Sequence, residues 1–98
     1  MHTLVAYPAD LRYEAEEALR LARVDPALVR ARADEDWGAL TADPETAGIA
    51  ELALGVAMTE LHELGEARGH LIRARDRFRG AGLRERLVEA QKIGRAHV

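Results

Sequence analysis

The same arrangement of apolar residues occurs twice in this chain, at positions 39 residues apart. In each copy the residues recur every three or four positions, which places them on one face of a helix. The two copies comprise Leu11, Ala15, Ala18, Leu19 and Ala22, and Ala50, Leu54, Ala57, Met58 and Leu61. Repeats of about 20–50 residues are typical of solenoids, whose helix pairs bury their faces against neighbouring pairs. The sequence therefore predicts an all-α fold of stacked antiparallel helix pairs, an α-solenoid, although ordinary amphipathic helices would give a similar match.

Two Asp-Pro pairs mark where helices begin. An aspartate side chain can cap a helix N-terminus, and proline fits the first helical position because that position needs no N–H. We therefore expect helices to begin near Pro26 and Pro44. After the first pair, apolar residues keep helical spacing as far as position 40. These residues are Val29, Ala33, Trp37 and Leu40.

The second half of the chain continues this pattern. After a short connection over residues 63–65, apolar residues at positions 67, 71, 74 and 78 predict another helix. Gly80 and Gly82 should end it, since glycine readily adopts the left-handed conformation of helix C-termini. A fifth helix is expected to open around Leu83, with Leu87 and Ala90 facing inward. The predicted pairs span residues 10–42 and 44–80, a third pair opens at residue 83, and residues 1–9 form an N-terminal extension.

Residues 46–80 carry a spaced set of small and large apolar side chains. Leu54-Gly55 lies in the first helix, Ala67 lies early in the second, and Leu71 and Ala74 follow. This pattern resembles the tetratricopeptide repeat, and residues 10–42 resemble it more weakly. The small residues would let two antiparallel helices approach closely, while the leucines fill the groove between them. The residues expected to pack this repeat are Leu54, Gly55, Met58, Ala67, Leu71, Ala74 and Phe78.

The chain also departs from the pattern of that family. Glu51 stands where an aromatic residue is usual, His62 replaces the usual glycine of the turn, and no proline closes the repeat. The period is longer than the roughly 34 residues typical of the family.

Three short segments carry a further resemblance. The runs ALRLA at residues 18–22, VDP at 24–26 and ELALGVAM at 51–58 resemble the N-terminal repeats of actinobacterial CHAT-domain proteins. In that family a caspase-like protease domain lies far downstream of the repeats. The resemblance implies a protein-interaction module, the N-terminal part of a larger bacterial protein, without a catalytic residue of its own. A repeat-containing regulator of transcription or signalling and a stand-alone helical scaffold are the alternatives.

The resemblance also implies a binding surface. In tetratricopeptide proteins the first helices of successive pairs line a concave surface. Leu52, Val56, Thr59 and Glu60 would face a protein or peptide partner there, because they lie off the apolar stripe of their helix. The alternative for Leu52 and Val56 is packing against an adjacent first helix. Further repeats of the same chain are the other expected partner.

Residues suited to catalysis or cofactor binding are scarce. The sequence has no cysteine, no glycine-rich phosphate loop and no nucleophile elbow, so we expect no active site and no cofactor. His62, Glu66 and His70 recur every four residues, but the expected turn separates them and a fourth metal ligand is missing. We therefore interpret His62 as a turn residue and His70 as a surface residue of its helix.

Charge is distributed unevenly along the chain. Residues 1–66 contain 14 acidic residues and five arginines, whereas residues 67–91 contain three acidic residues and seven arginines. Residues 34–36, all acidic, indicate a solvated helix face.

Arg68, Arg75 and Arg79 share one side of their helix, but no aromatic platform accompanies them, so we do not expect nucleic-acid binding. The acidic first pair and the basic fourth helix would favour head-to-tail self-association.

The chain carries no sign of a membrane-bound or exported protein. No apolar run approaches the length of a membrane span, and the N-terminus lacks the charged start and apolar region of a signal peptide. We therefore expect a cytoplasmic protein.

The last residues have an unusual origin by our interpretation. Residues 93–98 (IGRAHV) can be back-translated into a string that resembles the start of a common short-read sequencing adapter. Lys92, the sole lysine, lies at the junction. We interpret residues 92–98 as an adapter-derived tail and residues 1–91 as part of a longer reading frame. The alternative is a genuine helix end with Gly94 as its cap.

Overall fold

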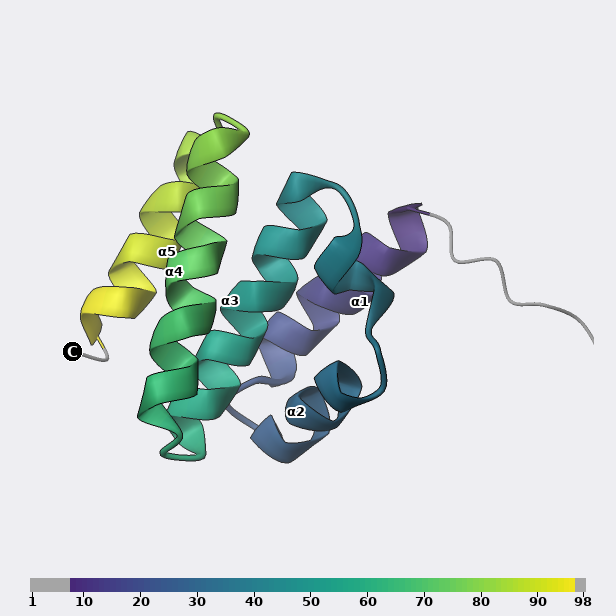
Figure 1. The fold of residues 1–98 in the computed structure, drawn as a ribbon, viewed down its shortest axis with the longest axis vertical. Helices are drawn as coiled ribbons and strands as arrows, with labels where there is room; N and C mark the ends of the chain where they lie inside the picture. The colour runs from purple at the N-terminus through teal and green to yellow at the C-terminus, as the bar shows by residue number, and fades with distance from the viewer. Residues whose placement is uncertain (1–7, 97–98) are drawn as a thin grey trace, which may run out of the picture.

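The computed structural model describes residues 8–96, which form five α-helices and one short 3-10 helix (Figure 1). The elements are α1 (Pro8–Leu21), α2 (Pro26–Asp34), η1 (Gly38–Thr41), α3 (Pro44–Glu60), α4 (Leu64–Gly80) and α5 (Arg84–Ala96). These residues contain no β-strand, so the all-α prediction is confirmed. None of these helices is both long and apolar enough to cross a membrane. The expected N-terminal extension covers residues 1–9, and the expected tail covers residues 92–98. Residues 8–9 belong to α1 and residues 92–96 to α5, whereas residues 1–7 and 97–98 lie outside the described residues.

Aspartate and proline begin α2 and α3, as the sequence predicts. The Asp25 carboxylate accepts a hydrogen bond from the Leu28 amide at 3.3 Å, and the Asp43 carboxylate accepts one from the Thr46 amide at 3.1 Å. A proline follows each aspartate at the first helical position. The cap therefore satisfies amides that the first turn of a helix leaves without partners.

The helix after Asp25 is shorter than its apolar spacing predicts. α2 ends at Asp34, whereas Trp37 precedes η1 and Leu40 lies within it. Asp36 marks the break, because its φ of 60° is left-handed and cannot continue a right-handed helix. The predicted helical face over residues 34–36 is therefore helical only at Asp34. Trp37 is still buried in the core, since η1 folds back against α1 and α3.

The turns that end α3 and α4 have the same geometry. In each, a left-handed residue follows the helix, His62 with φ of 62° and Gly82 with φ of 70°. The amide of the next residue donates to the carbonyl five positions back, at 2.8 Å for Glu63 and 2.9 Å for Leu83. This arrangement is the Schellman motif. α4 consequently begins at Leu64, which places two residues of the expected connection inside the helix.

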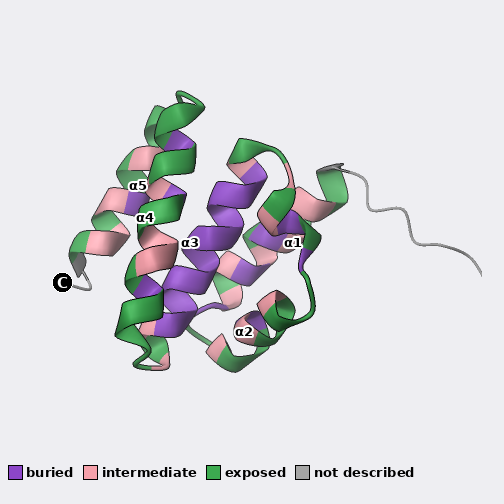
Figure 2. Cartoon of the chain, in the orientation of Figure 1, coloured by how far each residue is buried: buried purple, intermediate pink, exposed green. Residues whose placement is uncertain are grey.

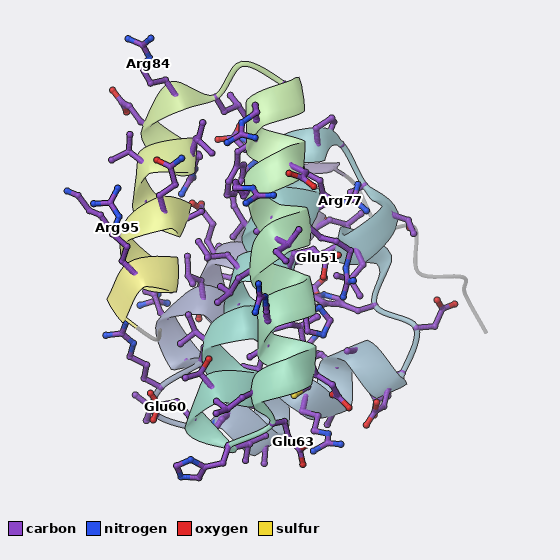
Figure 3. All side chains as sticks on the ribbon, turned by 60° about the vertical axis from the view of Figure 1, so that its left-hand side comes forward. Glu51, Glu60, Glu63, Arg77, Arg84 and Arg95 are labelled. Carbon is purple, nitrogen blue, oxygen red and sulfur yellow. The ribbon has the colours of Figure 1, made fainter. Side chains whose placement is uncertain are left out.

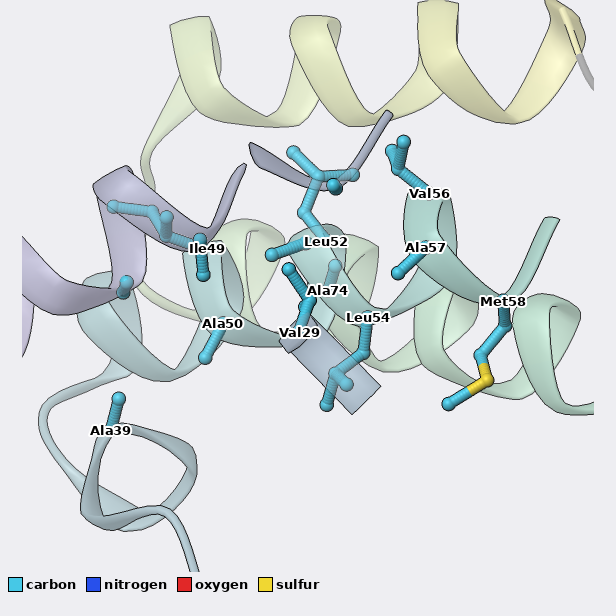
Figure 4. Close-up of a cluster of buried hydrophobic side chains, with 14 of the residues drawn as sticks. Val29, Ala39, Ile49, Ala50, Leu52, Leu54, Val56, Ala57, Met58 and Ala74 are labelled. Carbon is cyan, nitrogen blue, oxygen red and sulfur yellow. The ribbon is translucent and has the colours of Figure 1, made fainter. Parts of the chain in front are cut away.

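α3 lies at the centre of the fold and is buried on all sides over residues 46–58 (Figure 2). A helix that is apolar around its whole circumference is expected inside a protein rather than at its surface. α1, α2, η1 and α4 all contact α3, while α5 packs mainly on α4. Figure 4 shows side chains of α3, among them Ile49, Leu52 and Leu54, leaving the helix in different directions within the core.

Two glycines of α3 allow its close contact with α4, the most extensive helix contact of the fold. A Cβ atom on Gly55 would lie 2.5 Å from the Leu71 side chain, and one on Gly48 would lie 2.3 Å from the Phe78 ring. Gly48 stands two turns before Gly55 and is not part of the repeat pattern. The other residues expected to pack the repeat are buried or partly buried here: Leu54, Met58, Ala67, Leu71, Ala74 and Phe78.

Candidate protein-interaction surface

The residues predicted to face a partner do not form a surface patch. Leu52 and Val56 are buried in the core, because neighbouring helices cover α3. The Thr59 hydroxyl donates to the Gly55 carbonyl at 2.8 Å, and Glu60 is exposed at the end of the helix. The assignment of Leu52 and Val56 as partner-facing residues is corrected accordingly. They take the packing role that the sequence also allowed.

A groove between α1 and α2 is the better candidate for a partner site. Large apolar side chains are exposed around it and in the turn that joins the two helices: Tyr13 is 66%, Leu28 47% and Val24 79% exposed. α1 and α2 touch each other far less than α3 and α4 do, so the space between them stays open. The groove is lined by Tyr13, Glu14, Glu17, Ala18, Leu21, Leu28, Val29 and Arg32.

Charged side chains form the rim of this groove. Arg32 of α2 donates to the Glu14 carboxylate of α1 at 2.7 Å, and Glu17 pairs with Arg20 on α1. Both pairs are at least partly exposed, so each contributes little to stability. An apolar floor with a charged rim is the usual composition of a site for a peptide or a protein segment.

No family model, curated protein or solved structure matches this chain. The function is therefore inferred from the described surfaces and from the residues that form them.

Glu51 is the one charged residue whose side chain is almost fully buried in the described part of the chain, at 5% exposure. Its carboxylate lies 2.7 Å from His70 Nδ1 and accepts a hydrogen bond from Arg73 Nε at 2.9 Å. Burial by itself would raise the pKa of Glu51, but the hydrogen bond to His70 and the charge of Arg73 hold that pKa below its ordinary value. The cluster joins α3 to α4, and both carboxylate oxygens are occupied. It therefore acts as a structural ion pair.

His70 is thus not the free surface residue that the sequence predicts. Its ring turns toward α3 and is partly buried, since Glu51 offers a buried acceptor. His62 lies in the turn before α4 and is exposed, as is Glu66 in the first turn of α4. Among the described residues, no three potential metal ligands converge.

Arg86 of α5 joins three helices. It donates to Glu16 of α1 at 2.7 Å and to Glu45 of α3 at 3.2 Å. Arg12 of α1 also pairs with Glu45, at 2.9 Å. Burial would lower the pKa of Arg86, but the hydrogen bonds to Glu16 and Glu45 outweigh it and raise that pKa. Arg86 is therefore held within the chain and is not offered to a partner.

A second set of mostly exposed residues, which we call the basic face, lies on α4 and α5. Helical spacing places its α4 residues on one side of that helix and its α5 residues on one side of the other. Arg84 and Arg95 project into solvent from α5 in Figure 3. Leu64, Ile72 and Val88 add exposed apolar area between the charges. The basic face comprises Leu64, Arg68, Ile72, Arg75 and Arg79 of α4, and Arg84, Val88 and Arg95 of α5.

Periodicity did not single out the groove, although a signal was present. Tyr13 and Leu28 are large apolar residues that lie off the apolar stripes of their helices, and Val24 lies in the turn between them. Large apolar residues outside a stripe are either buried by an unforeseen neighbour or exposed for a partner. Here they are exposed.

Proposed function

We propose that this chain is a protein-interaction module whose α1–α2 groove binds an apolar segment of a partner protein. The observation that carries the proposal is the exposure of Tyr13 and Leu28, which line a single groove, together with that of Val24 in the turn between the two helices. Exposed apolar residues that occur singly need no explanation, whereas a group of them rimmed by charges marks an interaction site.

The resemblance to tetratricopeptide repeats also favours protein binding, but through a different surface. The concave surface of such repeats would use the first helix of the second pair. In this chain that helix is α3, and its apolar residues are already covered. The groove lies instead between α1 and α2, which contact each other less than any other two consecutive α-helices do. A partner segment there would bury Tyr13 and Leu28 and complete the packing of α1 against α2.

Selection of peptides from a displayed random library tests this proposal. Peptides selected on the chain should be rich in apolar residues, and Leu28→Asp should weaken their binding at least about tenfold, since a buried charge without a partner opposes docking. Ala81→Asp is the control, because Ala81 is exposed in the turn between α4 and α5 and belongs neither to the groove nor to the basic face. Titration calorimetry of each variant gives the affinities. Selected peptides that bind the wild type and the Leu28→Asp variant equally well would rule out the groove.

A further inference from the structure

We infer that copies of this chain associate head to tail, with the basic face of one copy covering the α1–α2 groove of the next. The inference rests on the proposed function, because it assigns a partner to the same groove. The two surfaces differ in composition and in position. In Figure 1, α1 and α2 lie on one side of α3, and α4 and α5 lie on the other, although Arg86 of α5 reaches Glu16 of α1.

The exposed apolar residues fall into two groups that match these surfaces. Tyr13, Val24 and Leu28 belong to the groove side, and Leu64, Ile72 and Val88 belong to α4 and α5. On one side of α4, apolar and basic residues alternate from Leu64 to Ile72, and two further arginines follow. A helix of this composition suits an apolar groove with acidic groups nearby, because its apolar residues enter the groove while its arginines reach the rim.

The two segments of the chain that carry these surfaces have net charges of opposite sign. Residues 8–36 contain eight acidic residues and five arginines, whereas residues 64–96 contain four acidic and nine basic residues. Charge complementarity of this kind orients two partners and raises their association rate. A surface of one sign also opposes binding of an identical surface, which disfavours contact between two basic faces.

Several of these charges have no opposite partner within the described part of the chain. On the basic face, Arg68, Arg79 and Arg84 form no ion pair with residues 8–96, in contrast to Arg73 and Arg86. At the end of α2, Asp34 and the two acidic residues after it also form no ion pair with the described residues. Head-to-tail contact would bring these two sets together.

The contact would be heterologous, since it joins two different surfaces. Each copy that docks through its groove still offers its basic face, so the assembly extends instead of closing as a symmetric dimer. This property makes the inference testable by complementation. A variant with a defective groove and a variant with a defective basic face should each remain monomeric. Their mixture should form a heterodimer and nothing larger, because only one intact groove and one intact face can meet.

We would measure the mass distribution of the whole chain by sedimentation velocity over a wide concentration range, at low and at high salt. The wild type should form species that grow with concentration and dissociate at high salt, because salt screens exposed charges. Leu28→Arg is the groove variant and places a positive charge where the basic face would dock. Arg68→Glu combined with Arg79→Glu is the face variant. Tyr13→Arg is a second groove variant, and thermal melts confirm that each variant is folded.

A wild type that stays monomeric at low salt and high concentration would overturn the inference. So would folded variants that still assemble alone, or a mixture that yields no heterodimer. The head-to-tail inference and the proposed function can be refuted independently of each other. If copies stay apart while selected peptides still require Leu28, only the head-to-tail inference fails. If copies assemble as described while no peptide requires the groove, only binding of a foreign partner is refuted.

Discussion

His62 and Gly82 occupy the same position in two similar turns, yet only Gly82 lacks a Cβ atom. A left-handed conformation costs a residue with a Cβ atom about 1–2 kcal/mol. We expect His62→Gly to raise the free energy of unfolding by about 0.5–1 kcal/mol, since glycine avoids this cost but gains freedom in the unfolded chain. Urea denaturation followed by circular dichroism measures the difference.

His62→Ala is the control for that experiment. Alanine keeps the Cβ atom and removes only the imidazole, so it should not stabilise the protein. A stabilisation of equal size in both variants would show that the imidazole ring, and not the backbone conformation, is unfavourable at this turn.

Glu51 makes the contact between α3 and α4 sensitive to acid. Its pKa in the folded protein is lower than the ordinary 4.5, so its ionised form stabilises the fold above pH 4.5, and this stability is lost as the pH falls through the lower folded-state pKa. Glu51→Gln should lower the free energy of unfolding by about 1–3 kcal/mol at pH 7, because a neutral amide cannot neutralise Arg73. The deficit should shrink at acidic pH. Stability measured from pH 7 to pH 3 for both proteins tests this.

The exposed pair of Arg30 with Glu63, 3.8 Å apart, provides the comparison for Glu51. Glu63→Gln should change stability by no more than about 0.5 kcal/mol, as is usual for exposed ion pairs. A deficit for Glu51→Gln that persists unchanged below pH 4 would show that its cause is packing and not charge.

At the scale of elements, α2 and α3 begin with the same Asp-Pro pair but differ in the number of hydrogen bonds that the capping aspartate accepts. The Asp43 carboxylate accepts from the Thr46 hydroxyl at 2.8 Å as well as from the amide, and Arg12 also donates to it. These hydrogen bonds, led by that of the Thr46 hydroxyl, hold the pKa of Asp43 below its ordinary value. Asp25 accepts one longer, exposed bond.

We therefore expect Asp43→Ala to lower the free energy of unfolding by about 1–2 kcal/mol and Asp25→Ala by about 0.5–1 kcal/mol. Both variants are measured by denaturant titration at neutral pH. Equal losses would mean that the additional bonds of Asp43 contribute nothing beyond the cap itself.

Helix starts were predictable here, whereas helix ends were less so. An Asp-Pro pair has one favourable place in a helix, so Pro26 and Pro44 fixed two starts. The end of α2 was misjudged because Trp37 and Leu40 happen to continue the helical spacing. Nothing in the composition shows that Asp36 takes a left-handed conformation, since aspartate also occurs within helices.

The candidate surface was harder to predict for a related reason. Periodicity shows which residues share a face of a helix, but it does not show how many neighbours surround that helix. Leu52 and Val56 lie off one stripe, yet other helices cover them. The apolar character of α3 around its whole circumference was the available signal for its central position.

At the scale of the whole molecule, α3 is enclosed by α1, α2, η1 and α4, whereas α5 packs mainly against one neighbour. Amide hydrogens of residues 46–58 can therefore exchange with solvent only when most of the fold opens, while α5 can open alone. We expect hydrogen exchange under native conditions to show the slowest amides in α3 and much faster ones in α5. Equal protection of the two helices would contradict this picture. Arg84, Val88 and Arg95 of the basic face lie on α5, so transient local unfolding of α5 would remove that part of the face while the centre of the protein stays folded.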